Sequence, residues 1–149
     1  AEVGAWSNPL SDNPEEAKNA FVKCTGALAL ADEINARCCV NISGSRNPKE
    51  WDAPHADNLT QATFDLIVET TRKIIDAVKP SRTFFTLEMM PWMYPDSTQS
   101  CLDLMKAIVR NCYGKADVLR YEEVAKPTPA DDEVLGPPAQ RHLVSGLGR

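Results

Sequence analysis

The chain has 149 residues, of which 43% are hydrophobic and 25% are charged, and its net charge is −5. This composition is ordinary for a globular domain and excludes a wholly disordered chain, a collagen and a coiled coil, while the length predicts one domain. The acidic balance argues against broad binding to nucleic acid or to an acidic membrane surface. No apolar run approaches the ~18 residues of a membrane span.

The start of the chain and its cysteines predict a cytoplasmic protein. The first residues, AEVG, contain no basic region followed by an apolar stretch, so we expect no signal peptide. They also lack an initiator Met, which indicates a processed chain or a fragment. The cysteines are odd in number and form no C-x-x-C pair, which favours reduced thiols over disulfides or a zinc site. They are Cys24, Cys38, Cys39, Cys101 and Cys112.

The first half of the chain predicts a strand, a helix and a second strand. Residues 1–6 are short and apolar and can end a strand. Asn13 followed by Pro14 is typical of a helix start, and apolar residues then recur at three-four spacing as far as Ile34. Residues 38–42 read as a short strand, and the proline-containing residues 43–59 read as a long loop.

The next elements repeat this order. The periodicity predicts a helix over 60–78, ended by Lys79-Pro80, and a strand over 83–89 that is rich in aromatic and β-branched residues. Residues 91–96 form a loop, and Asp96 or Ser97 caps a third helix. From Gly114 onward, proline, glycine and acidic residues dominate. We therefore expect a domain over residues 1–112 and an irregular or disordered tail over residues 113–149.

The resulting β-α-β-α-β-α order predicts an α/β fold with parallel strands and right-handed crossovers. Connections from helix to strand are short, whereas those from strand to helix are long. Because ligands bind at the carboxyl ends of parallel strands, we expect the working face on residues 6–12, 43–59 and 90–96. Alternation along the strands predicts one apolar face and one polar face, which favours a barrel over a doubly wound sheet. The polar positions are Glu2, Asn41, Ser43, Thr86 and Glu88.

Glu88 is the sharpest candidate for chemistry. It lies at the carboxyl end of its strand on the expected polar face. A carboxylate there can hold a hard divalent cation and can act as a general base. The alternative is a solvated carboxylate at the rim, or one that is paired with Arg82 or Arg46.

Four other residues are candidates for binding a substrate. Asn41 lies at a polar strand position, and Arg46 can bind a carboxylate or phosphate unless it only pairs with a nearby acid. His55 can contact a substrate or move a proton, although a surface histidine is the commoner outcome. Trp92 can form an apolar wall around a sugar or simply anchor its loop. The absence of G-x-G-x-x-G, P-loop, G-x-S-x-G and H-E-x-x-H motifs argues against nucleotide binding and serine hydrolase chemistry.

Three segments resemble the xylose isomerase-like TIM barrels, which are sugar phosphate isomerases and epimerases. The segments are EVGAWSNP at 2–9, ALADEI at 29–34 with CCVNISG at 38–44, and TLEMMPW at 86–92. The resemblance covers about residues 1–110 and implies a (β/α)₈ barrel that holds Mn²⁺ or Mg²⁺ through carboxylates and a histidine. Glu88 matches the glutamate that ends the fifth strand of the epimerases, where it is both metal ligand and acid/base.

The chain also departs from this family. A full barrel needs ~250 residues, and the later ligands of the family come from strands six to eight. Nothing after Arg110 resembles those strands, and His142 receives no ligand role. We therefore expect a partial barrel of three parallel βα units that corresponds to strands three to five. Open barrel edges of this kind favour self-association.

Two functions remain open on these grounds. The first is a metal-dependent sugar (phosphate) isomerase or epimerase that acts through an enediolate on a small sugar or hydroxy-carbonyl substrate and is inactive as this fragment. Dehydratase or hydroxypyruvate isomerase chemistry fits the same scaffold. The second is a non-catalytic, truncated α/β module that binds a small ligand or a partner.

Overall fold

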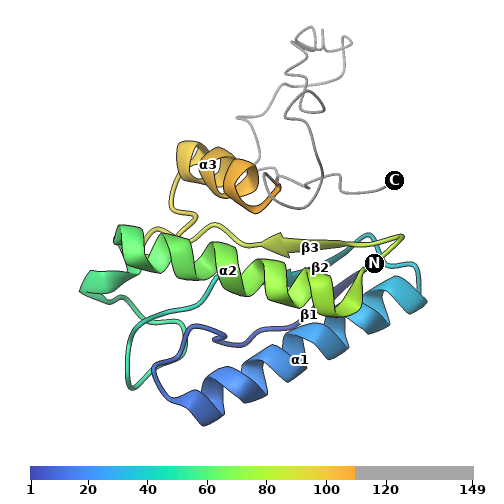
Figure 1. Ribbon diagram of the computed structural model, residues 1–149, viewed down its shortest axis with the longest axis horizontal. Coiled ribbons are helices and arrows are strands. Elements are labelled where there is room, and N and C mark those ends of the chain that lie inside the picture. Colours follow the sequence, from blue (N-terminus) through green and yellow to red (C-terminus); the bar gives the residue numbers. More distant parts are fainter. Residues whose placement is uncertain (110–149) are drawn as a thin grey trace, which may run out of the picture.

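The computed structural model describes residues 1–109. Its elements follow the order β1 (Glu2–Gly4), α1 (Pro14–Glu33), β2 (Cys38–Asn41), η1 (Ala56–Leu59), α2 (Gln61–Val78), β3 (Phe84–Leu87) and α3 (Thr98–Val109) (Figure 1). The predicted alternation of strands and helices is confirmed, and a short 3₁₀ helix, η1, is added inside the predicted long loop. The tail predicted for residues 113–149, and the end of the predicted domain at residue 112, lie outside the described residues.

The strands form one parallel sheet in the order β1-β2-β3. β2 is the central strand: Cys39 is aligned with Val3 of β1 and with Phe85 of β3. The prediction of parallel, adjacent strands is confirmed. Among residues 1–109 the sheet has only these three strands and is not closed.

Local sequence explains where the long helices begin and end. The Asn13 side chain accepts hydrogen bonds from the backbone N–H groups of Glu15 and Glu16, which would otherwise have no partner at the start of α1. Thr60 caps α2 in the same way through the N–H of Thr63, and Lys79 ends it in a left-handed conformation at φ 52°. Ile34, expected on the buried face of the first helix, is 55% exposed because it lies beyond the last helical residue.

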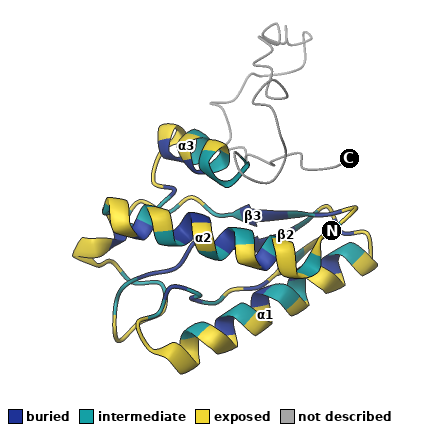
Figure 2. Cartoon of the chain, in the orientation of Figure 1, coloured by how far each residue is buried: buried dark blue, intermediate teal, exposed yellow. Residues whose placement is uncertain are grey.

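Both α1 and α2 cover the same side of the sheet, and α3 packs beside α2 (Figure 1). Most of β2, the middle of β3 and the adjoining sides of the helices are buried, whereas β1 and the outer sides of α1 and α2 are largely exposed (Figure 2). The main cluster joins sheet residues such as Ala5, Cys39 and Phe85 to Leu28 of α1 and Ile74 of α2. A second cluster between α2 and α3 contains Leu10, Ile67, Val68 and Leu104. No helix in the described part of the chain is long and apolar enough to cross a membrane.

The pairing register corrects one expectation about the sheet faces. Asn41 is aligned with Leu87 and donates a hydrogen bond to Cys24 of α1, so it lies on the side that the helices cover. Thr86 and Glu88 alternate to the opposite side, which α1 and α2 leave uncovered. The prediction that Asn41 shares a polar face with Glu88 is therefore wrong. Alternation separates the two sets of residues in each strand, but only the pairing shows which sets lie together.

Asp32, near the end of α1, fixes the turn that leads into β3. Its Oδ1 accepts hydrogen bonds from the backbone N–H groups of Ser81, Arg82 and Thr83 at 2.6–3.1 Å. The N–H of Arg82 is the largest cause that holds the pKa of the Asp32 carboxyl below its usual value. A carboxyl whose pKa is lowered by folding stabilises the folded state above its unfolded pKa, and this contribution disappears as the pH falls through the folded pKa.

We expect Asp32→Asn to lower the urea midpoint of unfolding at pH 7, since the charge that strengthens these hydrogen bonds is removed. The difference from the wild type should shrink as the pH falls below about 4, where the carboxyl of the unfolded chain becomes protonated, and should disappear only below the lowered pKa of the folded state, where the folded wild-type carboxyl is neutral as well. Equilibrium urea unfolding at several pH values measures this. Asp76→Asn, at an exposed position of α2, is the matched control. An effect of Asp32→Asn that stays constant down to pH 2.5 would contradict the assignment.

Candidate functional site

The loops at the carboxyl ends of the strands are joined by buried amide side chains. Asn8, in the β1–α1 loop, donates from Nδ2 to the carbonyl of Ser45 at 2.7 Å and accepts from the N–H of Ser45 at 3.0 Å. Gly44 has φ 118°, and a Cβ there would lie 2.9 Å from Cγ of Leu10 and closer still to Oδ1 of Asn8. Glycine at position 44 therefore permits the close approach of these two loops.

Asn58, in η1, connects the loops that follow β2 and β3. It is fully buried. Its Oδ1 accepts from the N–H of Arg46 at 2.8 Å, and its Nδ2 donates to the carbonyls of Ala53 at 3.2 Å and Trp92 at 3.0 Å. Both ends of the amide are thus satisfied by backbone groups of two separate loops. Nothing local in the sequence singled out this residue, because its partners are up to 34 positions away.

Glu88 extends the sheet by one residue beyond β3. Its N–H donates to the carbonyl of Asn41 at 2.8 Å, and its side chain is half-buried. Within residues 1–109, it makes no ion pair with Arg82 or Arg46, the two partners considered from the sequence. Glu88 therefore lies at the carboxyl end of β3, on the side of the sheet opposite α1 and α2, where Val40 and Thr86 are buried.

The other expected site residues have structural partners. The Arg46 guanidinium donates to the carbonyl of Leu10 at 3.1 Å and pairs with Asp12, so it fastens the β1–α1 loop. Nδ1 of His55 accepts from the N–H of Asp57 at 3.3 Å and caps η1. The Trp92 indole N–H donates to the carbonyl of Asp52 at 2.8 Å. Arg46, His55 and Trp92 thus lie on the strand-end loops, where each also holds a loop in place.

Asn41 is placed differently. It is fully buried, and its amide accepts from the N–H of Ser7 at 2.9 Å and donates to the carbonyl of Ser7 at 3.1 Å. The same Nδ2 also lies 3.4 Å from Sγ of Cys24. The structure does not bring Asn41 to the side of the sheet on which Glu88 lies, and its amide positions the chain that follows β1.

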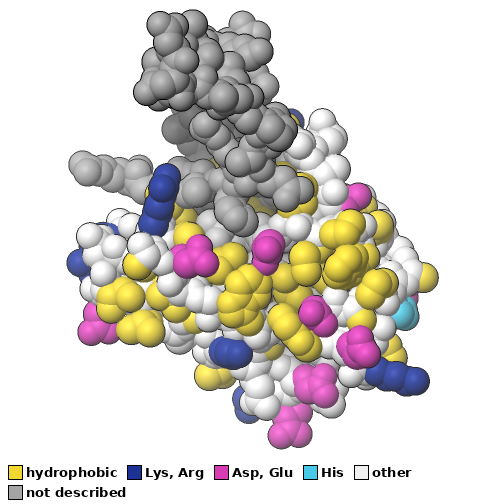
Figure 3. Space-filling view, turned by 180° about the vertical axis from the view of Figure 1, so that it is seen from behind, with side chains coloured by type: hydrophobic (Ala, Val, Ile, Leu, Met, Phe, Trp, Pro, Cys, Tyr) yellow, Lys and Arg dark blue, Asp and Glu magenta, His cyan; other side chains and the backbone are white. Residues whose placement is uncertain are grey.

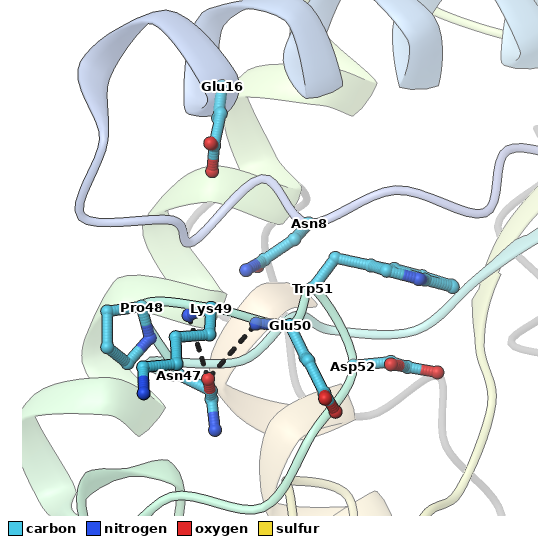
Figure 4. Close-up of a pocket in the computed structure, with 8 residues that line it drawn as sticks. All are labelled: Asn8, Glu16, Asn47, Pro48, Lys49, Glu50, Trp51 and Asp52. Atoms are coloured by element: carbon cyan, nitrogen blue, oxygen red, sulfur yellow. Dashed lines mark hydrogen bonds between the residues drawn. The ribbon is translucent and has the colours of Figure 1, made fainter.

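A cavity of about 410 Å³ lies between the β1–α1 and β2–η1 loops (Figure 4). Its polar lining consists of three carboxylates, two amides and one amine. Asn47 shapes it by accepting from the N–H groups of Lys49 at 2.9 Å and Glu50 at 3.1 Å. The carboxylates of Glu50 and Asp52 point to one side, and the amine of Lys49 points to the other (Figure 4). The lining residues are Asn8, Glu16, Asn47, Pro48, Lys49, Glu50, Trp51 and Asp52.

Two further observations concern metals and thiols. Across residues 1–109, no three His, Cys, Asp or Glu side chains gather in a way that could hold a metal ion. Glu88 could supply only one of the roughly six ligands that Mg²⁺ prefers, so residues 1–109 do not by themselves form a complete centre for Mn²⁺ or Mg²⁺.

The four cysteines of residues 1–109 are free. Burial raises the pKa of Cys39 to about 12 and also raises the pKa of Cys24, so neither thiol is a ready nucleophile.

Comparisons of the chain with protein-family models, with curated proteins and with solved structures give no match. The geometry described above therefore carries the functional argument.

We expect Asn58→Leu to destabilise the protein by about 3 kcal/mol, because it leaves several buried backbone groups without partners. Amide hydrogens of residues 44–54 and 91–94 should then exchange faster together, while those of β1 to β3 keep their protection. Hydrogen exchange read by mass spectrometry measures this, with Asn19→Leu at an exposed position of α1 as the control. Faster exchange in only one of the two loops would show that Asn58 does not couple them.

Proposed function

We propose that Glu88 is the acid/base residue of a sugar (phosphate) isomerase or epimerase that acts through an enediolate. The observation that carries the proposal is the place of Glu88. It is a half-buried carboxylate without an ion-pair partner among the described residues, and it lies at the carboxyl end of a parallel strand. Catalytic groups of parallel α/β enzymes lie at this end of their strands.

The side of the sheet opposite α1 and α2 supports a barrel as the architecture of the whole. Gly4, Val40, Phe84 and Thr86 lie on this side, Val40 and Thr86 are buried there, and α1 and α2 cover only the other side. Helices outside and layered side chains inside are the arrangement of a (β/α)₈ barrel, of which β1, β2 and β3 provide three strands. The resemblance of residues 2–9, 29–34, 38–44 and 86–92 to the xylose isomerase-like barrels implies the same architecture.

The chemistry follows from one carboxylate and a small hydroxy-carbonyl substrate. Glu88 removes a proton from the carbon next to the substrate carbonyl, and the electrons of the broken C–H bond form the enediolate. The hydroxyl proton of the carbon that lost its hydrogen passes to the former carbonyl oxygen, and Glu88 returns its own proton to the former carbonyl carbon. The carbonyl has then moved by one carbon, and the isomerisation is complete. A Mn²⁺ or Mg²⁺ ion would stabilise the enediolate oxygens when bound. Glu88 would contribute one ligand to that ion. The proton transfers made by Glu88 do not depend on the ion.

The second candidate is a non-catalytic α/β module that binds a small ligand or a partner. The open sheet of residues 1–109 favours it. The two candidates differ in one measurable property, which is exchange of a carbon-bound proton of the ligand with solvent.

We expect Glu88→Gln to slow this exchange by at least about 100-fold, because general acid–base catalysis contributes ~10²–10⁴-fold in rate. The measurement is deuterium incorporation from ²H₂O into D-fructose, D-xylulose and D-ribulose with Mn²⁺ present, followed by mass spectrometry. It uses the protein with its full natural sequence, since the resemblance to the xylose isomerase-like barrels implies further metal ligands from later strands.

Glu33→Gln, at an exposed position near the end of α1, is the control and should leave the rate unchanged. An exchange rate for Glu88→Gln within threefold of the wild type would refute the acid/base role. Binding of the ketoses without any exchange in the wild type would favour the non-catalytic module.

A further inference from the structure

The outer side of α1, which is exposed (Figure 2), carries large hydrophobic side chains. Val22 is 60% exposed and Leu30 is 48% exposed. Each lies two residues from a buried residue of α1, Cys24 or Leu28, and therefore about 200° around the helix from the packed side. Ile34, directly beyond the helix, continues this line at a spacing of four residues and is also exposed.

The other helices have no such line. Within residues 1–109, no large hydrophobic side chain of α2 or α3 is exposed. The exposed side of α2 consists of charged and polar residues and alanine. Single exposed hydrophobic residues are normal on any protein, but a line of them on one helix indicates a contact surface.

Gly26 lies on the same line, between Val22 and Leu30. A Cβ built on Gly26 would meet no atom within 4 Å, so nothing in the fold prevents a larger residue there. Glycine inside a helix destabilises it relative to alanine, because the unfolded chain loses more conformational freedom on folding. Its advantage is that a second helix can approach closely at a position without a side chain. The exposed line is therefore suited to packing against another helix, with Gly26 at the crossing point.

The charges near the two ends of α1 are complementary to those of a second copy. Lys18 lies eight residues before Gly26 and Glu33 lies seven residues after it, and both are exposed. Neither forms an ion pair within residues 1–109. If two copies of α1 cross antiparallel at Gly26, Lys18 of each copy lies beside Glu33 of the other. A parallel pair would instead place like charges side by side, so the antiparallel pair is favoured.

The side of the sheet opposite α1 and α2 is less suited to pairing with itself. Its hydrophobic side chains lie among several Asp and Glu side chains (Figure 3). A two-fold axis at this place would bring one acidic surface against another, and the like charges would repel. Of the two surfaces, the outer side of α1 therefore fits a second copy better.

We propose that two copies of this chain associate through the outer sides of α1, which cross antiparallel at Gly26. Val22 and Leu30 lie in the contact, and Lys18 pairs with Glu33 of the other copy. The contact is isologous, so each ion pair occurs twice and the dimer is closed. One helix from each copy gives an interface below the standard size, so we expect a Kd on the order of 10–100 μM. Because α1 leads from the carboxyl end of β1 to the amino end of β2, Glu33 is remote from Glu88, and the proposal is independent of the proposed catalysis.

The first test is sedimentation equilibrium of the 149-residue chain, with concentrations that span the expected Kd from about 5 to about 500 μM. We expect Gly26→Arg to weaken the association at least tenfold, because its side chain blocks the close approach of the helices. The same substitution should raise the urea midpoint of unfolding, since arginine is a better helix former and the position is open. Ala77→Arg, at an exposed position of α2, is the control and should leave the association within twofold.

The orientation is tested by charge reversal. We expect Lys18→Glu and Glu33→Lys each to weaken the association by about three- to tenfold, and the double variant to restore it. A double variant that associates no better than either single variant would overturn the antiparallel pairing.

Cross-linking with a carbodiimide, which joins an amine directly to a carboxylate, tests the contact itself. Lys18 and Glu33 of one chain are about 22 Å apart along α1, so a bond between them forms only between two copies. In a mixture of ¹⁴N- and ¹⁵N-labelled chains, we expect a Lys18–Glu33 cross-linked peptide that contains both isotopes. Dimers cross-linked only elsewhere, or an association that Gly26→Arg leaves unchanged, would overturn the proposal. A monomer at every concentration would do so too, and would leave this side of α1 to a different partner.

Discussion

Three buried asparagines set the arrangement of the strand ends. Where a parallel strand leaves its sheet, the next backbone N–H and C=O groups lose their ladder partners, and burying them without replacements is costly. Asn8, Asn41 and Asn58 supply the replacements, and each amide uses both its oxygen and its nitrogen on backbone groups of another loop. One side-chain amide can replace two backbone partners at once, which a hydroxyl or a single carboxylate does less well. The loops at this end are consequently fixed relative to one another.

The second constraint is the division of the sheet into two sides. α1 and α2 bury the side that carries Ala5, Cys39 and Phe85, while the other side presents Gly4, Thr86 and Glu88. Asn41 lies on the covered side and reaches Ser7 at the strand end, so it acts on the uncovered side only through the backbone. Asn41, which was predicted as a substrate-binding residue, thus holds the backbone of Ser7, next to the exposed side chain of Trp6.

Local sequence patterns were sufficient to predict the helices and strands, but they were not sufficient to predict the residues of the candidate site. The Asn13-Pro14 start, the three-four spacing of the helices and the apolar runs of the strands predicted all three helices and all three strands, with ends that differ by one to a few residues. The position of Glu88 at a strand end followed from the same reasoning. Asn58 and Trp6 were not identified, because their significance lies in partners that are 34 and 17 positions away, respectively, or in a backbone angle. Pairing register, which placed Asn41 on the covered side, is likewise a long-range property.

Trp6, directly beyond β1, has a left-handed backbone conformation with φ 33°. The residue type at this position shows whether the chain needs only a turn here or also needs a particular side chain. If the chain beyond β1 only had to bend through a left-handed conformation, glycine would do so without strain, as Gly44 does beyond β2 at φ 118°. Tryptophan there costs about 1–3 kcal/mol and requires contacts that hold it in place. Lys23 and Asn41 provide those contacts, and Gly4 leaves the space that the indole fills. Three other positions are thus adapted to a side chain that is itself 43% exposed and adds little to the core.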